Sequence, residues 1–371
     1  MAQLDAHPLD HNAGGPVDPR VLACFLQAER ELPGNPASAH QLGRRARSAV
    51  EDARLRIARV LGSAVDDVVF CSGGTEANNL AGAGLGEAAL PVLLAPVEHP
   101  SILLPARRRG AVWWGVDCQG CAVITAPPTA VGLVCLVHAQ GEVGAIQPVV
   151  EAADLADDLK VPLHVDLAQS LGRLEVTDIV ARAASVSVSP HKCGGMRGVG
   201  LLVVRNAERR LRPQMLGGAQ EHGLRPGTVS PSLAIATALA VELAAQEQQA
   251  RARRMTDARR AFVQELAGSG VQHRVLTPEG SLPNTTMVMF LQVDGRNLLP
   301  AIDLAGVFAS HGSACSSGSP QPPAVLLAMG LSEDEARACV RFSCGADLTA
   351  DAARDAAHRV AFAVQRIQKK N

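Results

Sequence analysis

The sequence predicts an α/β protein: a large domain built on a mostly parallel, mixed sheet flanked by helices, and a smaller α+β domain. Short apolar runs alternate with helical stretches between about residues 65 and 205, which is typical of parallel strands covered on both faces. An Ala/Leu-rich helix predicted over 232–266 leads away from this region, and the pattern of elements changes after it. A chain of 371 residues is long enough for two such units.

The elements can be justified in order. Most predicted strands of the large domain are short apolar runs that end in glycine, proline or polar residues: 68–71, 92–95, 112–116, 132–138, 163–166 and 199–204. The strand over 185–189 is predicted from its alternating serines and valines. Helical spacing occurs before or between them, up to about residue 60 and over 101–109 and 149–159. Beyond the long helix we predict strands at 285–293 and 340–343, a helix at 297–305, and a last helix from about 349. We therefore place the large domain at 15–245 and the small domain at 1–14 together with 246–371.

Composition narrows the function classes. The chain is 47% hydrophobic and 19% charged, and its formal charge of −1 gives no bias toward nucleic acid or an anionic membrane, so direct nucleic-acid binding is not expected. No run of about 18 apolar residues predicts a membrane span, and the start of the chain does not resemble a secretory signal. Nine cysteines without regular spacing fit reduced thiols, which predicts a cytoplasmic location.

Lys192 is the first candidate functional residue. Pro190 ends the strand over 185–189, and His191 and Lys192 follow directly. The other lysines are at positions 160, 369 and 370, while arginine supplies most positive charges. A lysine, unlike an arginine, can lose its proton and form a Schiff base. A lone lysine is more often a solvated surface residue, so only a supporting set of side chains favours the catalytic interpretation.

Such a set is predicted at the strand ends, where ligands bind in open α/β sheets. Gly74 and Thr75 open a helix after a strand, which suits a phosphate, although Thr75 as a simple helix cap explains them equally well. Asp166 ends another strand, where a carboxylate could be a cap but is also placed to hold a proton on a heterocyclic nitrogen. Four further polar residues lie at or just after strand ends: His99, Gln169, Ser189 and His191. Together with Lys192, Gly74, Thr75 and Asp166, they are the residue types that bind pyridoxal 5′-phosphate (PLP). Taken singly, each histidine is more often structural.

Cys315 is the second signal. It lies in a run of small and polar residues, 310–320, whereas most other cysteines lie in or beside apolar or helical segments. With an ordinary thiol pKa of about 8.5, it needs a nearby base or cation to react at neutral pH. The pair Cys118 and Cys121 has metal-ligand spacing but lacks a second pair, so no metal site is predicted there.

Several motifs occur in a fixed order along nearly the whole chain: Leu9-Asp10-His11-Asn12-Ala13, Gly34–His40, Ser72-Gly73-Gly74-Thr75-Glu76-Ala77-Asn78-Asn79, Glu98-His99, His164–Ser170, Ser189-Pro190-His191-Lys192, Gly223–Thr228, Gly312–Gly318 and Arg341-Phe342-Ser343. In this order they resemble the cysteine desulfurases of the NifS/IscS type. These belong to the class V aminotransferase family of fold-type I PLP enzymes. The resemblance implies that fold and a conversion of L-cysteine to L-alanine, with sulfur passing from an enzyme persulfide to an acceptor protein.

The resemblance also implies roles for individual residues. Lys192 carries PLP, Asp166 pairs with the ring nitrogen, and His99 stacks on the ring and shuttles protons. Cys315 attacks the substrate sulfur to form the persulfide. Gln169 is implied to contact the ring hydroxyl, and Arg341 is implied to bind the substrate carboxylate. The implied phosphate contacts are Gly74, Thr75, Ser189 and His191, with Thr228 from the other subunit of a homodimer.

The chain departs from the family pattern at three places. Gln140-Gly141 stands where the family has two asparagines, so Gln140 is expected to contact the substrate with a longer side chain. Gly14-Gly15 and Met196-Arg197 are the other departures. Another fold-type I enzyme, such as a selenocysteine lyase or aminotransferase, and a poorly active sulfur-relay scaffold remain as alternatives. The acceptor could serve iron–sulfur assembly, tRNA thiolation or DNA phosphorothioation. The arginine-rich, lysine-poor and alanine-rich composition and the Gln140-Gly141 departure suggest the last, DndA-like branch.

Overall fold

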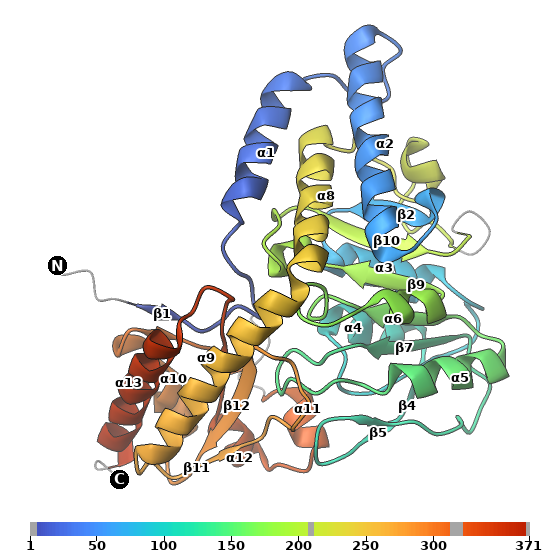
Figure 1. The fold of residues 1–371 in the computed structure, drawn as a ribbon. Helices are drawn as coiled ribbons and strands as arrows, with labels where there is room; N and C mark the ends of the chain where they lie inside the picture. Colours follow the sequence, from blue (N-terminus) through green and yellow to red (C-terminus); the bar gives the residue numbers. More distant parts are fainter. Residues whose placement is uncertain (1–5, 207–210, 312–321, 369–371) are drawn as a thin grey trace.

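A computed structural model describes residues 6–206, 211–311 and 322–368, and a seven-stranded sheet lies at its centre (Figure 1). The strand order is β2-β10-β9-β8-β7-β3-β4. Strand β10 runs antiparallel to both neighbours, and the other neighbouring pairs are parallel. The mostly parallel, mixed sheet predicted from the sequence is confirmed. In sheet order the strands are β2 (Val68–Cys71), β10 (Gly200–Val204), β9 (Ser185–Val188), β8 (Leu163–Asp166), β7 (Leu133–Val137), β3 (Val92–Leu94) and β4 (Ala111–Trp113).

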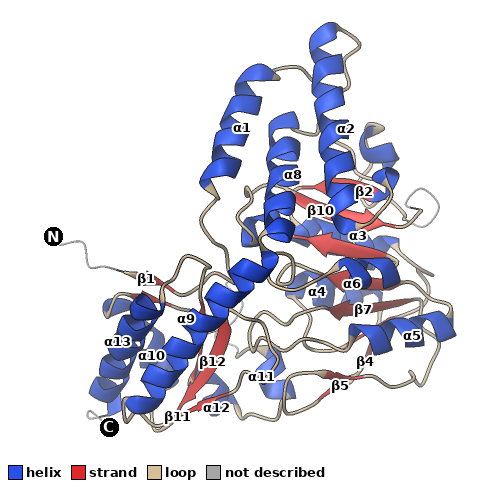
Figure 2. Cartoon of the chain, in the orientation of Figure 1, coloured by secondary structure: helices blue, strands red, loops and turns tan. Residues whose placement is uncertain are grey.

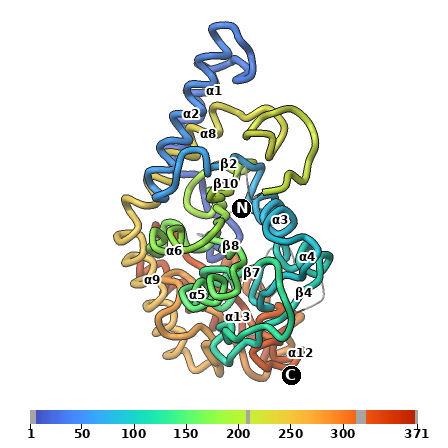
Figure 3. Tube along the Cα trace, turned by 90° about the vertical axis from the view of Figure 1, so that its right-hand side faces the viewer, coloured from blue at the N-terminus to red at the C-terminus, as the bar shows by residue number. Residues whose placement is uncertain are grey.

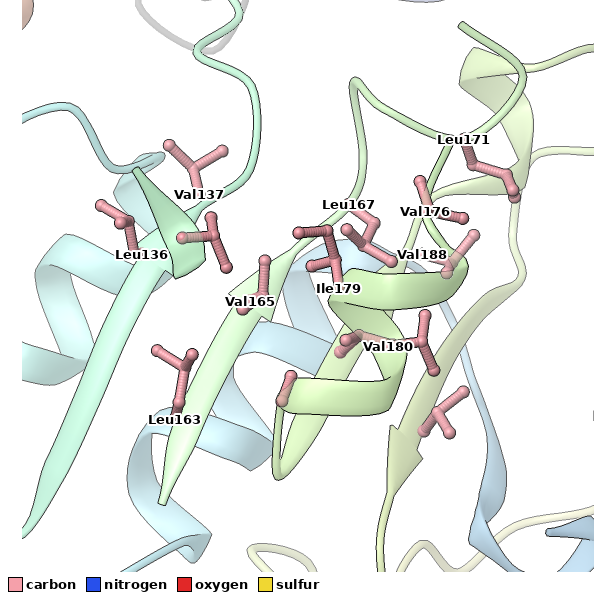
Figure 4. Packing of buried hydrophobic residues seen from close by; sticks show 14 of the residues in the cluster. Leu136, Val137, Leu163, Val165, Leu167, Leu171, Val176, Ile179, Val180 and Val188 are labelled. Atoms are coloured by element: carbon pink, nitrogen blue, oxygen red, sulfur yellow. The ribbon is translucent and has the colours of Figure 1, made fainter. Parts of the chain in front are cut away.

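Helices cover both faces of this sheet, because the strands are apolar on both sides. One face packs against α2 (Gln41–Leu61), α5 (Val149–Leu159), α6 (Thr177–Arg182) and α8 (Pro231–Gln246). The other face packs against α3 (Gly74–Gly84) and α4 (Pro100–Arg109), as the ribbon coloured by secondary structure shows (Figure 2). Figure 4 shows the first layer from close by, with Ile179 and Val180 of α6 beside Val165 of β8. This core holds the strand ends in fixed positions.

Helices α1 (Pro19–Glu31), α2 and α8 project beyond the sheet at the same end of the molecule (Figure 3). Helix α1 begins after Asp18, whose carboxylate accepts a hydrogen bond from the Arg20 amide, with proline at the first helical position. Both α1 and α2 pack against α8.

The smaller unit contains an antiparallel sheet in the order β11-β12-β14 and its own apolar cluster. This cluster fills the space between the sheet and helices α9, α10 and α13. Its elements are β11 (His273–Val275), β12 (Thr285–Phe290), β14 (Cys339–Ser343), α9 (Gln248–Gly268), α10 (Gly295–Leu304), α11 (Ala324–Ala328), α12 (Glu333–Arg337) and α13 (Ala350–Gln368). The shorter elements are β1 (His7–Pro8), which pairs in parallel with β13 (Val307–Phe308), the hairpin β5 (Gly115–Val116) and β6 (Ala122–Val123), and the 3₁₀ turns η1 (Val65–Asp67), η2 (Pro190–Lys192) and η3 (Gln220–Gly223).

The single helix predicted over 232–266 is two helices, α8 and α9. The chain bends at Glu247, whose φ of −98° and ψ of 2° leave the helical region. The Glu247 carboxylate accepts hydrogen bonds from Arg20 and Arg251, which hold the bend. The domain boundary proposed near residue 246 stays a prediction. Across the described ranges, no helix combines the length and apolar content that crossing a bilayer requires.

Candidate active site

One cavity of about 390 Å³ lies at the carboxyl ends of the central strands. This volume falls within the range of small-molecule sites. The segments after β2, β3, β7, β8 and β9 all contribute to its lining. Most residues predicted from the sequence as site residues line it: Gly74, Thr75, His99, Gln140, Asp166, Gln169, Ser189, His191, Lys192 and Arg341.

The Gly74 end of the cavity is built from hydrogen-bond donors. Gly73 is the N-cap of α3 and makes no side-chain cap, so the first amides of the helix lack a capping side chain. Thr75 lies inside the helix, so it is not the simple helix cap that the alternative interpretation predicted. A Cβ atom on Gly74 would collide with the Ser189 hydroxyl, so only glycine allows this close approach. These amides and hydroxyls form a site that suits an anion.

Two basic residues complete this end. Burial, together with the positive charges of Lys192 and Arg197, lowers the pKa of His191 to about 4, so its ring is neutral. Lys192 ends the turn η2, and its amide donates to the Ser189 carbonyl at 3.0 Å. The short turn therefore fixes Lys192 relative to the donors around Gly74.

Asp166 is a buried carboxylate at the end of β8, with 4% of its surface exposed. Its Oδ1 accepts from the Ala168 amide at 2.8 Å, and its Oδ2 accepts from Asn78 Nδ2 at 2.8 Å. Gln169, one turn further, donates from Nε2 to the Asn12 carbonyl at 3.0 Å and accepts from Arg173. The structure thus holds the carboxylate in one orientation within the cavity wall.

His99 is the N-cap of α4 and is one of the residues that line the cavity. Its Nδ1 lies 3.2 Å from the Ser101 amide nitrogen and 2.7 Å from the Ser101 hydroxyl. Burial lowers the pKa of His99, Asp166 raises it, and Lys192 lowers it, with a net result below the ordinary value. The imidazole is therefore neutral at neutral pH.

Arg341 occupies the other end of the cavity. It lies on β14 and is 2% exposed. Its Nη2 is 2.5 Å from Asp10 Oδ1, and its Nη1 donates to the Gly141 carbonyl at 3.1 Å. Among the described residues its Nε atom is buried and has no hydrogen-bond partner. The guanidinium is thus fixed in position with donor capacity remaining.

Gln140 lines the cavity, but its amide is engaged in its own turn. Its Oε1 accepts from the Glu142 and Val143 amides, both at 2.7 Å, and its Nε2 donates to Glu142 Oε2 at 3.0 Å. A Cβ on Gly141 would lie 2.8 Å from Gln169 Nε2, which explains the glycine at this position. Substrate contact by Gln140 stays a prediction.

One predicted site residue is described but does not line the cavity, and another cannot be placed relative to it. Thr228 is exposed and is not among the lining residues. Cys315 falls in 312–321 and so lies outside the described residues. Of the cysteine pair considered for metal binding, Cys118 is exposed and Cys121 donates to the Ile146 carbonyl. In the described part of the chain, no group of three His, Cys, Asp or Glu side chains is arranged to hold a metal.

Sequence reasoning gave no role to several residues that organise the site. Asn12 is 2% exposed and donates to the Gly141 carbonyl at 2.9 Å and to Thr285 Oγ1 at 2.8 Å, which ties the start of the chain to both parts of the cavity. Asp10 pairs with Arg341, and Asn78 holds Asp166. All three lie inside motifs already recognised along the sequence, and a polar residue within a motif was the available signal.

Comparison with known proteins follows from this geometry. The family model described as aminotransferase class-V matches residues 8–353. The chain is 34% identical to the cysteine desulfurase IscS 1 of Archaeoglobus fulgidus over 356 residues, covering 91% of each protein.

Solved structures give the same result. The chain superposes on a structure described as a NifS-like protein with a TM-score of 0.84 and 29% identity, covering 98% of this chain and 99% of the other. It also matches the crystal structure of DndA from Streptomyces lividans, with a TM-score of 0.74 and 31% identity over 88% of this chain and 96% of that one.

Proposed function

The chain belongs to the class-V aminotransferase family and, within it, to the PLP-dependent cysteine desulfurases, and from this we propose how its cavity carries out that activity. The observation that carries the proposal is that one cavity gathers a lysine, a buried carboxylate, a set of anion donors and a fixed arginine. Each of these groups matches one part of PLP or of an amino-acid substrate.

The residues present fit PLP. The glycine at position 74 leaves room for an anionic group between the α3 amides and the Ser189 hydroxyl, which suits the phosphate. Asp166 would hold the ring nitrogen, His99 would lie against the ring, and Lys192 would bind the aldehyde group. When bound, PLP supplies an electron sink for negative charge that develops on the substrate.

Arg341 would bind the substrate carboxylate. A guanidinium suits this partner because it donates two parallel hydrogen bonds. Asp10 and the Gly141 carbonyl hold the guanidinium in place. We expect L-cysteine, once held there, to lie between Arg341 and Lys192, with its sulfur accessible to Cys315.

Cys315 would take up the substrate sulfur as a persulfide while alanine leaves. Ser310, the residue five positions earlier, pairs through its backbone with Arg341 in both directions, at 2.6 and 3.2 Å. Five residues of chain span at most roughly 17 Å, so the cysteine backbone cannot lie farther than that from the arginine end of the cavity. This limit supports Cys315 as the acceptor.

We extend the proposal to the partners. The chain would act as a homodimer in which Thr228 completes the phosphate site of the other subunit, since Thr228 is exposed on its own subunit. The persulfide would pass to an acceptor protein of iron–sulfur assembly, tRNA thiolation or DNA phosphorothioation. Similarity to DndA keeps the last pathway among them. A cytoplasmic location is supported by the eight described cysteines, none of which forms a disulfide within the described residues.

The test is turnover of L-cysteine by the purified chain loaded with PLP. We expect alanine release together with a protein persulfide. Cys315→Ser should abolish the persulfide while cofactor absorbance stays, and Lys192→Ala should abolish the absorbance of the bound cofactor. Absence of alanine, or full sulfur transfer by Cys315→Ser, would refute the proposal. Alanine from selenocysteine but not from cysteine would identify a selenocysteine lyase instead.

A further inference from the structure

The position of the ring proton on His99 follows from the atoms around its Nδ1. The Ser101 backbone N–H can only donate, and it points at Nδ1 from 3.2 Å. Nδ1 must therefore present a lone pair. The Ser101 hydroxyl, at 2.7 Å from the same nitrogen, must then donate as well. A neutral His99 ring with an occupied Nδ1 lone pair carries its proton on Nε2.

Asn78 fixes the direction of the Ser101 hydroxyl. Its Nδ2 group donates two hydrogen bonds, one to Ser101 Oγ and one to Asp166 Oδ2, both at 2.8 Å. Since Ser101 Oγ accepts from Asn78, its own proton is available for His99. The amide is in turn oriented by His164, whose Nε2 lies 3.1 Å from Asn78 Oδ1 and whose Nδ1 lies 2.8 Å from the Ser185 hydroxyl. The network is buried and has one consistent set of donors and acceptors.

We propose that His99 stays neutral with its proton on Nε2 and works as a hydrogen-bond donor through that N–H rather than as a base, and that Ser101 and Asn78 are the positioning residues that impose this polarity. A second proton would have to enter at Nδ1, where two donors already point. The N-terminus of α4 also opposes a positive charge at its cap. Asp166 from β8 favours the charged ring, while Lys192 from η2 opposes it.

This inference rests on the proposed function only for the use of the Nε2–H hydrogen bond; the tautomer itself is a property of the chain. It changes the expected role of His99, because a neutral ring with Nε2–H can stabilise negative charge by donating a hydrogen bond but cannot accept a proton at Nε2. An analogous neutral histidine at a helix N-terminus acts as an electrophile in triosephosphate isomerase.

The experiment is ¹⁵N NMR of the PLP-loaded chain labelled at its 11 histidines, with the His99 signals assigned by their loss in His99→Gln. We expect a protonated Nε2 and an unprotonated Nδ1 at neutral pH. A proton on Nδ1, or on both nitrogens, would overturn the proposal. Absorbance of the cofactor and alanine release from the same samples separate the two proposals. A chain that binds no PLP refutes the proposed function, while the ring proton is still read from its NMR spectrum.

Two variants test the positioning residues, and a third is the matched control. Ser101→Ala removes one donor to Nδ1 and should move the His99 titration upward by about one pH unit, the size of one lost hydrogen bond. Asn78→Ala leaves the Ser101 hydroxyl free to turn away from Nδ1 and should move the His99 titration in the same direction as Ser101→Ala. Asn79→Ala, on the same helix, should leave the spectrum as in the wild type, because within the described residues Asn79 donates to the Thr75 and Ser101 carbonyls and not to the Ser101 hydroxyl. Unchanged His99 signals in both Ser101→Ala and Asn78→Ala would refute the positioning roles.

Discussion

Replacing Glu221 by glutamine tests the ion pair that anchors the segment carrying Thr228. The carboxylate is 2% exposed and receives Arg54 Nη1 at 2.9 Å, Arg54 Nη2 at 2.8 Å and the Phe70 amide at 2.7 Å. Glu221→Gln keeps the shape but leaves the Arg54 guanidinium, itself 4% exposed, without its buried counter-charge. Losing one partner of a buried pair costs about 3–5 kcal/mol. Glu51, which also bonds Arg54 at 3.1 Å from a half-exposed position, should bring the loss to the lower end, about 3 kcal/mol.

The assay is the free energy of unfolding from urea titration, with Glu333→Gln as the matched control. Glu333 also pairs with an arginine at 2.7 Å, but both side chains are exposed, so its loss should cost about 0.5 kcal/mol or less. A second readout is PLP affinity, because the segment that the Glu221 ion pair anchors carries Thr228, the proposed phosphate contact. Glu221 and His222 adopt φ angles of 48° and 56°, and the ion pair stabilises this backbone conformation. The reasoning is wrong if the two glutamine variants lose the same stability.

Three further predictions concern the cavity. Gly74→Ala should weaken PLP binding about tenfold or more in an absorbance titration, because the new methyl displaces the Ser189 hydroxyl; unchanged affinity would exclude this phosphate position. Arg341→Lys should raise KM for L-cysteine about tenfold or more with a smaller effect on kcat, and the reverse pattern would contradict carboxylate binding. Burial raises the pKa of Glu98 from 4.5 to about 8, so the folded chain holds this proton more tightly than the unfolded chain does. The free energy of unfolding should therefore fall as pH rises from 4.5 to about 8. Glu98→Gln should lack that slope in urea unfolding at both ends of the range; an identical slope would show that Glu98 ionises normally.

The central sheet could be predicted because its strands are short apolar runs buried on both faces, a pattern that few other structures share. The same reasoning gave one helix across Glu247, since a glutamate has good helix propensity and nothing local marks a break. One of the two arginines that bond Glu247 at the bend, Arg20, is 227 residues away along the chain. A contact between distant segments leaves no periodic trace in the sequence.

The candidate site divides in a similar way. Residues at strand ends, such as Asp166 and Lys192, could be placed together because parallel strands end at the same edge of a sheet. The orientation of a side chain could not be predicted. Gln140 is the clearest case: nothing in its residue type indicated that its amide accepts hydrogen bonds from the backbone of its own turn. The role of Asn78 could not be predicted either, because a polar residue early in a helix usually faces water or caps the helix, and nothing in the sequence indicated that it bonds Asp166.

The pairing of Arg341 with Asp10 has a consequence for substrate selection. A buried guanidinium with no counter-charge would be costly, so Asp10 stabilises Arg341 before any substrate arrives. The same carboxylate repels a second anion and reduces the affinity for free acids that reach this end of the cavity. A substrate with both a carboxylate and an ammonium group suffers less, because its positive charge offsets Asp10. If Arg341 binds the substrate carboxylate as proposed, the ion pair at 2.5 Å would favour zwitterionic amino acids over simple carboxylates, and this selection would operate before any chemistry at the sulfur begins.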